Sequence, residues 1–233
     1  MLPQINTHLS SSLQNEWFDI DFWQQQNAVT GHSKGRSITW FIEYQTNHWV
    51  LRHYHRGGLV AKLMRDYYWF SSVEQSRCFQ ELKLLELMYL QGLPVPKPIA
   101  ARVVKRGLFY QADLLIEKIP LSEDLVQRLG REPMTEVEWH SVGSMIAKFH
   151  QAGVFHADLN AHNILLDNDV KFWLIDFDKC EYRSTKDVSW ANKNLARLYR
   201  SFNKEKGLHQ TFHFDEQNWQ WFNSGYMSYY SKK

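Results

Sequence analysis

The sequence predicts an α+β fold in two parts: a small antiparallel sheet with one helix in an N-terminal lobe, and a reduced, mainly helical C-terminal lobe. The sheet is predicted by two runs rich in aromatic and β-branched residues, 38–44 (ITWFIEY) and 49–55 (WVLRHYH). The helices are predicted by two segments in which a Ser or Thr precedes a Glu by three residues and an apolar pattern of helical period follows. These observations favour one folded protein over a disordered or fibrous chain.

The composition is that of a globular protein, with 44% hydrophobic and 22% charged residues. The formal charge of +2 gives no reason to expect nucleic acid as a partner. Cys78 and Cys180 lie far apart, so we expect neither a disulfide framework nor a zinc site. The N-terminal residues lack the pattern of a secretory signal, and no run approaches the roughly 18 apolar residues of a spanning helix. We therefore expect any membrane contact to be peripheral.

The first lobe begins with about 25 polar residues that carry scattered aromatic side chains, which we interpret as a loosely structured lead-in. GHSKG, residues 31–35, predicts a flexible loop, and QTNH joins the two aromatic runs as a hairpin. A helix is expected from Ser71, with Glu74 completing a capping box, to a stop at Gly92.

Glu81 is a carboxylate on the mostly apolar face of this expected helix, which it shares with Cys78, Leu85 and Met88. A buried carboxylate needs a cation or hydrogen-bond donors. An ordinary salt bridge to Arg77, one turn earlier, is as good an explanation as a functional role.

The prolines at 94, 96 and 98 predict an extended connector, and DLLIEKI at residues 113–119 predicts a buried strand that ends at Pro120. We place the lobe boundary there, giving lobes 1–119 and 120–233. A second helix is expected from Thr135 to Gly153, followed by a short strand ILL, a turn DND and a strand KFWLID.

The stretch FHADLNAHNILLD, residues 155–167, places polar side chains between two apolar runs. Asp158 could accept the proton of a hydroxyl, while Asn163, five residues later, and Asp176, thirteen beyond that, could hold Mg²⁺ against nucleotide phosphates. Each residue alone is better explained as a turn or cap residue, and His156 as a brace within the loop. The ordered set is what indicates a phosphoryl-transfer site.

Upstream residues supply the remaining parts of such a site. Arg52 on the second aromatic run could meet both Glu81 and the α- and β-phosphates. Gly31, Lys34 and Gly35 would cover the phosphates, and the backbone from Glu117 to Ile119 would hydrogen-bond the adenine edge. The parts of the site follow a fixed order along the chain: the glycine loop, the basic residue on a strand, the Glu on a helix, the hinge, the catalytic loop and the Asp that would bind metal.

In this order of parts the chain resembles the protein-kinase-like superfamily over nearly its full length. Within it, the chain is similar to the lipopolysaccharide core kinases that act on 3-deoxy-D-manno-octulosonic acid (Kdo). The narrower resemblance rests on six blocks: LRHYHRGGLVAKL, GLPVPKPIAAR, LLIEKIP, HADLNAHNILL, WLIDFDKC and NLARLYRSFNKE. It implies a two-lobed fold and an ATP- and Mg²⁺-dependent kinase that phosphorylates the 4-hydroxyl of Kdo on a lipid A precursor, at the cytoplasmic face of the inner membrane.

The chain departs from protein kinases at four positions. Ala157 stands in place of the Arg that would clamp a phosphorylated activation loop, and Asn160 in place of a Lys near the γ-phosphate. Asp178 replaces the Gly of Asp-Phe-Gly, and Arg52 replaces a strand Lys. Because the chain has 233 residues, only 57 follow Asp176, and we expect these to be too few for a full activation segment together with helices that dock a protein substrate. A small or lipid-linked acceptor is therefore favoured.

Two basic segments are candidates for acceptor binding. Arg56, Lys62 and Arg65 are interleaved with aromatic residues, and a later stripe holds Lys193, Arg197, Arg200 and Lys204 at helical spacing. Such a stripe suits anionic head groups or a phosphorylated, carboxylated sugar, although a solvated helix face is as good an explanation. A heptose kinase, a kinase of another small molecule and, less favoured, a non-catalytic nucleotide-binding relative remain open alternatives.

Overall fold

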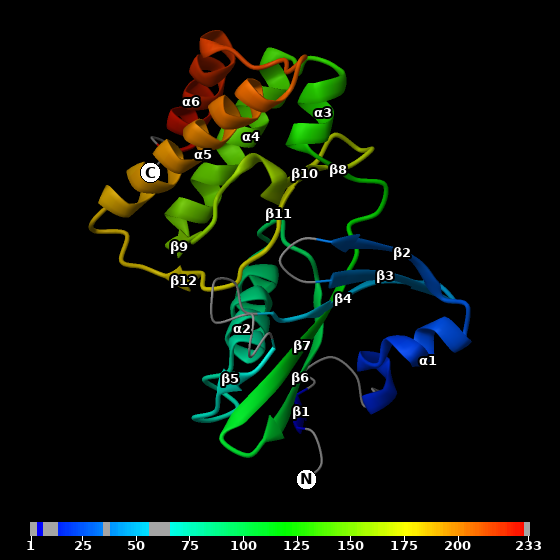
Figure 1. Ribbon diagram of the computed structural model, residues 1–233. Helices are drawn as coiled ribbons and strands as arrows, with labels where there is room; N and C mark the ends of the chain where they lie inside the picture. The colour runs from blue at the N-terminus through cyan, green and yellow to red at the C-terminus, as the bar shows by residue number, and fades with distance from the viewer. Residues whose placement is uncertain (1–3, 7–13, 35–37, 56–65, 231–233) are drawn as a thin grey trace. The chain divides into compact units, whose positions relative to one another are not determined.

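The computed structural model describes residues 4–6, 14–34, 38–55 and 66–230, which divide into two compact units (Figure 1). Unit 1 comprises Met1–Tyr89 and Pro96–Lys118, and unit 2 comprises Leu90–Val95 and Ile119–Lys233. The expected boundary after residue 119 would have assigned Leu90–Val95 to the first lobe instead. The predicted α+β class, with an antiparallel sheet in the N-terminal part and helices in the C-terminal part, is confirmed.

Unit 1 is built on a seven-stranded sheet in which every pairing is antiparallel, in the order β1-β6-β7-β4-β3-β2 with β5 paired to β7. The strands are β1 (Gln4–Asn6), β2 (Val29–Lys34), β3 (Ile38–Tyr44), β4 (Asn47–His53), β5 (Tyr68–Trp69), β6 (Pro98–Arg106) and β7 (Phe109–Glu117). The predicted hairpin is β3–β4, with Tyr44 opposite Asn47. The prediction of a connector through Pro98 was wrong at its end, because β6 begins at that proline.

The expectation of a loosely structured lead-in was wrong for Gln4–Asn6, which form β1, and for residues 14–25. The latter segment forms a short 3-10 helix, η1 (Asn15–Phe18), and a helix, α1 (Ile20–Gln25). Trp23 of α1 is fully buried, with its ring 5.7 Å from that of Trp49 on β4. The scattered aromatic residues therefore cover one face of the sheet instead of being exposed.

The GHSKG segment is a strand as far as Lys34, not a flexible loop. Gly31 lies within β2 opposite Phe41, and Lys34 pairs with Ile38. The register shifts between Val29 and Gly31, which places a β-bulge beside the glycine. Gly35, the last residue of the expected loop, lies outside the described residues.

Helix α2 (Arg77–Leu90) begins six residues later than predicted. Its first hydrogen bond runs from the Gln80 N–H to the Ser76 carbonyl, 3.0 Å, so Ser71 is not its cap. Residues 71–76 form turns in which Ser72 Oγ accepts from the Gln75 N–H. The predicted end is correct, since Gly92 has a φ of +72° that glycine adopts without strain.

Unit 2 contains four α-helices, a short 3-10 helix and two small sheets among its described residues. They are β8 (Glu123–Asp124), α3 (Leu125–Arg131), α4 (Glu136–Gln151), β9 (Val154–Phe155), η3 (Ala161–Asn163), β10 (Ile164–Leu166), β11 (Phe172–Leu174), β12 (Glu181–Tyr182), α5 (Ser189–Leu208) and α6 (Glu216–Tyr230). Thr135 and Glu138 make the predicted capping box of α4. Helices α3 and α6 were not predicted.

Helices α4 and α6 lie side by side in unit 2 (Figure 1). A Cβ added to Gly143 on α4 would be 2.0 Å from the Phe222 carbonyl oxygen, and one added to Gly225 on α6 would be 2.2 Å from that of His140. The two backbones are therefore in direct contact at a pair of glycines. This contact fixes α4, the helix that precedes β9 and the loop after it.

Candidate active site

The predicted catalytic loop, residues 156–163, is fixed at both ends by strand pairing within unit 2. Before it, β9 pairs with β12, with Phe155 opposite Glu181. After it, β10 pairs with both β11 and β8. The predicted β10–β11 hairpin is present, and it places the segment around Asp176 next to the loop, because the Ile175 N–H donates to the Asn163 carbonyl oxygen at 3.0 Å.

His156 braces this loop from inside. Its side chain is 2% exposed, and Nδ1 accepts from the Asp158 N–H at 3.2 Å. Nε2 therefore carries the proton of the neutral ring and donates to the Ile175 carbonyl oxygen at 3.0 Å. Burial lowers the pKa of His156, so the ring stays neutral. One imidazole thus joins the loop to the strand that leads to Asp176.

Two asparagine side chains converge on the backbone of Asp158. Asn160 Nδ2 and Asn163 Nδ2 each donate to the Asp158 carbonyl oxygen at 2.9 Å. Asn160 Oδ1 also accepts from the N–H groups of His162 and Asn163 and caps η3. The Asn160 side chain therefore shapes the loop, whereas the Oδ1 oxygen of Asn163 makes no hydrogen bond to another residue in the described part of the chain.

The Asp158 carboxylate forms an ion pair with Arg197 of α5, which joins Oδ1 to Nη2. Both side chains reach solvent, with exposures of 39% for Asp158 and 48% for Arg197. Asp158 is therefore a partly exposed carboxylate of unit 2 that is held through its Oδ1 oxygen. This is the position that a general base for an external hydroxyl requires.

Helix α5 forms hydrogen bonds to the catalytic loop through two further residues, which were not predicted from the sequence. Asn194 is 2% exposed, accepts from the His156 N–H at 3.2 Å and donates to the His156 carbonyl oxygen at 3.0 Å. Ser201 Oγ accepts from the Ala161 N–H at 3.0 Å. The sequence held a signal for Asn194, which is a polar residue on the helical stripe of buried Trp190, Leu198 and Phe202.

Asp176 follows β11 with a φ of +62°, a left-handed backbone conformation that is uncommon outside glycine and often found at functional sites. The next residue, Phe177, is 1% exposed, with its ring 5.0 Å from His156 and 6.0 Å from Phe149. The buried phenyl ring holds the turn, while the carboxylate of Asp176 is only half-buried.

Asn163 and Asp176 fit a Mg²⁺ ion by the chemistry of their donors. Mg²⁺ takes oxygen ligands and is commonly held by one or two carboxylates together with phosphates and water. The amide oxygen of Asn163 and the carboxylate of Asp176 lie on segments joined by the backbone hydrogen bond from Ile175. The described residues contain no group of three or more His, Cys, Asp or Glu side chains that could hold a metal by themselves.

In unit 1 the structure brings Arg52 and Glu81 together. Their ion pair joins Nη2 to Oε2, and the Tyr54 hydroxyl donates to the same carboxylate oxygen while accepting from Arg52 at 2.9 Å. Glu81 is 3% exposed, so the buried carboxylate has the cation that it needs. Arg77, the alternative partner, donates to the Tyr68 hydroxyl at 2.9 Å. Tyr54 was not predicted as part of this cluster.

The hinge segment has fewer available groups than predicted. The Glu117 N–H donates to the Lys97 carbonyl oxygen and the Lys118 N–H to that of His48, each at 2.9 Å. The Ile119 N–H makes no hydrogen bond to another described residue, although Ser122 Oγ donates to its carbonyl oxygen. Of the three backbone N–H groups in this segment, that of Ile119 is therefore the one without a partner among the described residues.

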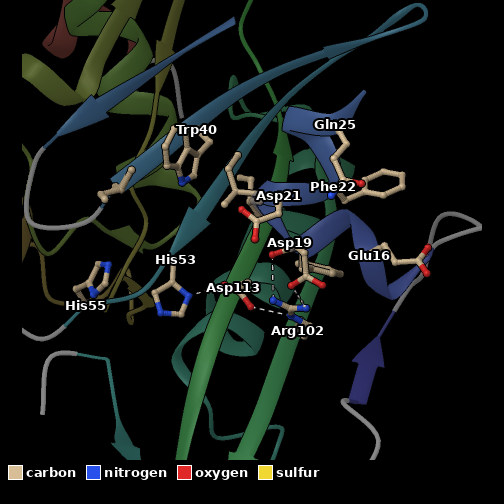
Figure 2. Close-up of a pocket in the computed structure, with 14 residues that line it drawn as sticks. Glu16, Asp19, Asp21, Phe22, Gln25, Trp40, His53, His55, Arg102 and Asp113 are labelled. Carbon is tan, nitrogen blue, oxygen red and sulfur yellow. Dashed lines mark hydrogen bonds and ion pairs between the residues drawn. The ribbon is translucent and has the colours of Figure 1, made fainter. Parts of the chain in front are cut away.

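A pocket in unit 1 is lined by a different set of residues (Figure 2). It has a volume of about 810 Å³ and lies on the face of β4 that carries Leu51 and His53, whereas Arg52 points to the opposite face. Its floor holds buried Asp113, which accepts from Arg102 Nε at 2.8 Å and contacts His53 Nδ1 at 2.6 Å.

This charged cluster stabilises the sheet where α1 covers it. Arg102 also donates to Asp19 on the rim of the pocket, and Figure 2 shows these side chains converging. Burial alone would lower the pKa of His53, but the hydrogen bonds and charges of Asp113 and Asp66 outweigh it, so the pKa is raised. Asp113, Arg102, His53 and Asp19 are thus joined to one another by hydrogen bonds and ion pairs.

The basic residues predicted to bind the acceptor divide into two groups. Arg56, Lys62 and Arg65 lie outside the described residues. The predicted stripe is exposed on α5, where Arg200 lies one turn beyond Arg197, and Leu198 and Phe202 are buried on the opposite side. None of the helices in the described ranges has both the length and the apolar character needed to span a bilayer.

The chain is similar to known proteins over most of its length. The lipopolysaccharide kinase (Kdo/WaaP) family model matches residues 20–226. Curated proteins named 3-deoxy-D-manno-octulosonic acid kinase are similar over most of their length. That of Vibrio parahaemolyticus is 51% identical over 201 residues, which is 86% of this chain and 83% of the relative. Those of Haemophilus influenzae and Mannheimia succiniciproducens are 48% identical over 214 residues (88% and 87%) and 46% identical over 222 residues (92% and 91%).

Proposed function

Since the chain belongs to the lipopolysaccharide kinase (Kdo/WaaP) family, we propose that it transfers the γ-phosphoryl group of ATP to the 4-hydroxyl of Kdo on a Kdo-lipid A precursor. This reaction belongs to the biosynthesis of the lipopolysaccharide inner core. The observation that carries the proposal is the Asp158 carboxylate, which is exposed at its tip and fixed at its backbone by His156, Asn160 and Asn163. Positioning and electrostatics supply most of the catalysis in phosphoryl transfer.

Asp158 acts as the general base in this proposal. Its Oδ2 oxygen accepts the proton of the sugar hydroxyl as the hydroxyl oxygen forms a bond to the γ-phosphorus. The bond from that phosphorus to the β,γ-bridging oxygen breaks, and ADP leaves with the electron pair. The products are the Kdo phosphate, ADP and a proton first held by Asp158. General base catalysis of this kind contributes about 10²–10⁴-fold to the rate.

Asn163 Oδ1 and the Asp176 carboxylate would hold Mg²⁺, which neutralises phosphate charge when bound. Arg52, positioned by Glu81 and Tyr54, would contact the α- and β-phosphates from unit 1. Gly31, Lys34 and Gly35 would cover the phosphates, and the free N–H of Ile119 would meet the adenine edge. The guanidinium of Arg is less compact than the ammonium of the Lys that protein kinases carry on this strand, but its charge is permanent.

We also propose that the enzyme works at the cytoplasmic face of the inner membrane, to which it binds peripherally. The exposed basic stripe of α5 supports this, because juxtamembrane Lys and Arg are attracted to anionic lipid surfaces. Arg200 on the stripe, and Arg56, Lys62 and Arg65 outside the described residues, remain candidates for contacts with the anionic acceptor.

The test is incubation of the full chain with labelled ATP, Mg²⁺ and a panel of lipid A precursors that carry Kdo, heptose or neither sugar. We expect one phosphate on the Kdo-bearing precursor, with mass spectrometry fixing the sugar and NMR fixing O4. Phosphorylation of the heptose-bearing precursor alone would instead establish the alternative acceptor. A chain that binds ATP but labels no acceptor would favour the non-catalytic alternative.

A further inference from the structure

Arg197 is the side chain of α5 that meets the proposed base directly. Asn194, three residues earlier, makes two hydrogen bonds to His156, and Ser201, four residues later, accepts one from Ala161. Three positions on one side of the helix therefore face the loop. Because the helix is held on both sides of Arg197, the guanidinium is delivered to Asp158 by the fold and not by a chance surface contact.

The catalytic loop does not supply a cation of its own at this point. Asn160 stands where a protein kinase carries a lysine, and its side chain makes three hydrogen bonds to the loop backbone. Within the described part of the chain, the ion-pair partner of Asp158 is Arg197. The positive charge beside the base therefore comes from a residue 39 positions later in the sequence.

Arg197 also has N–H donors that its contact with Asp158 does not use. A guanidinium presents five N–H groups in a planar fork, and the structure gives Arg197 one contact, from Nη2 to Asp158 Oδ1. Its other N–H groups bond no further described residue, and the side chain is 48% exposed. Such a fork matches a carboxylate in two parallel hydrogen bonds, a geometry that lysine cannot reproduce.

We propose that Arg197 is a specificity-determining residue that binds the carboxylate of the acceptor sugar while it holds Asp158, an inference that rests on the proposed function. An octulosonic acid carries its C1 carboxylate on C2, and the 3-deoxy carbon has no hydroxyl. O4 is therefore the first hydroxyl beyond the carboxylate that lies on the ring. A guanidinium that bridges the sugar carboxylate and Asp158 Oδ1 brings O4, in preference to O5, O7 or O8, toward Asp158 Oδ2.

The same arrangement explains how an anionic acceptor approaches an anionic base. Without Arg197 the two carboxylates would repel one another at close range. With it, one cation serves both, and a neutral sugar gains less from the site than an acidic one. The predicted discrimination is thus a difference in affinity between acidic and neutral acceptors of equal shape.

The test compares wild type, Arg197→Gln and Arg197→Lys on two acceptors, the Kdo-bearing precursor and the same precursor with its Kdo carboxylate reduced to an alcohol. We expect wild type to prefer the acid by about 10- to 100-fold in kcat/KM, the range for a hydrogen-bonded charged group. Arg197→Gln should lose most of this preference, chiefly through a higher KM for the acid, and Arg197→Lys should recover part of it. Calorimetric binding of free Kdo should weaken in the same order.

Lys206→Gln is the matched control, since it removes one positive charge from an exposed position on the same helix. It should retain the full preference for the acid. An Arg197→Gln variant that discriminates between the two acceptors as strongly as wild type would overturn the inference, as would a loss of kcat that is equal for both. Wild-type inactivity on both acceptors would instead overturn the proposed function on which the inference rests.

Discussion

Glu81 is a buried carboxylate on which two other side chains of unit 1 depend. Replacing it by Ala leaves the Arg52 guanidinium, 14% exposed, and the Tyr54 hydroxyl without their shared acceptor. Breaking a buried ion pair in this way typically costs about 3–5 kcal/mol. We expect Glu81→Ala to lower the free energy of unfolding in urea by that amount.

Glu86→Ala on the same helix is the control for this change, because Glu86 is only half-buried. Substitutions away from a buried network usually change stability by no more than about 0.5 kcal/mol. Equal effects of the two variants on the free energy of unfolding would show that the Arg52–Glu81–Tyr54 cluster does not stabilise unit 1.

His150 makes the stability of unit 2 dependent on pH. Its ring is 1% exposed, Nδ1 lies 2.9 Å from the Tyr226 hydroxyl, and burial lowers the pKa of the imidazole from 6.5 to about 4. Below pH 6.5 the unfolded chain takes up a proton on His150 that the folded chain does not accept until about pH 4. The folded state is therefore favoured above pH 6.5 and loses that advantage as the pH falls.

The expected loss is on the order of 3 kcal/mol between pH 6.5 and 4, at 1.36 kcal/mol for each pKa unit. Burial lowers the pKa of His156 as well, which adds a loss of the same sign. Urea unfolding across this pH range should show a shallower decline for His150→Gln than for wild type. Parallel declines would contradict the assignment of this proton to His150.

At the scale of single residues, the sequence predicted the types of group but few of their partners. The Arg52–Glu81 pair was predictable because a carboxylate on an apolar helix face requires a cation. The Asp158–Arg197 pair was not, since 39 residues separate the two and each lies in a segment with an independent explanation. The same is true of Asp113, whose contact with His53 spans 60 residues and depends on the register of β4 against β7.

At the scale of elements, the contact between α4 and α6 depends on two glycines. Alanine at Gly225 would place its Cβ 2.2 Å from a backbone oxygen, which cannot move without separating the helices. We expect Gly225→Ala to lower the free energy of unfolding by about 3 kcal/mol or more. Thermal or urea unfolding of the full chain measures this directly.

Gly207→Ala on α5 provides a control of opposite sign. Nothing lies within 4 Å of a Cβ at Gly207, and alanine is favoured over glycine within a helix by about 0.5–1 kcal/mol. The control should therefore be neutral or stabilising. A Gly225→Ala variant as stable as wild type would contradict the close backbone contact between α4 and α6.

Helices and strands were predictable where the spacing of apolar residues, the capping residue and the terminating residue all indicated the same element. The helix from Thr135 had all three, and the β3–β4 hairpin had two clear strands and a short turn. Helix α1 has six residues, too few for a helical period to emerge from a polar background. GHSKG was misjudged because its glycines indicate a loop, whereas pairing with β3, the next strand along the chain, makes residues 31–34 a strand.

At the scale of the whole molecule, the basic stripe of α5 predicts attraction to anionic membranes. Each Lys or Arg near such a surface contributes about 1 kcal/mol, and a charge reversal also adds repulsion. Arg200→Glu combined with Lys204→Glu should therefore weaken binding to anionic vesicles at least about tenfold, with 1.4 kcal/mol for each factor of ten. Co-sedimentation with vesicles of phosphatidylglycerol and phosphatidylethanolamine measures the change.

A control with the same change in net charge reverses two exposed residues of unit 1, Lys83 and Arg106, to Glu. It should bind the vesicles more tightly than the α5 variant does. Equal weakening by both pairs would mean that net charge alone decides binding, and the stripe would then be a solvated helix face, the alternative left open by the sequence.

The class of the fold was predictable at this scale because strand-rich and helix-rich patterns occupy different parts of the chain. The sequence did not predict that Leu90–Val95 belongs to unit 2, since this depends on contacts such as the hydrogen bond from the Leu174 N–H to the Pro94 carbonyl oxygen. The six sequence blocks that resemble lipopolysaccharide core kinases carried the prediction of family further than any local pattern did.

The proposed phosphoryl transfer to Kdo depends on Asp158 as its base. The most direct measurement is the kcat of Asp158→Asn on the Kdo-bearing precursor, beside Asp169→Asn, which changes an exposed aspartate in the β10–β11 turn. We predict that Asp158→Asn loses about 10²–10⁴-fold in kcat while ATP still binds, and that the control keeps wild-type activity. Full activity of Asp158→Asn would contradict the account.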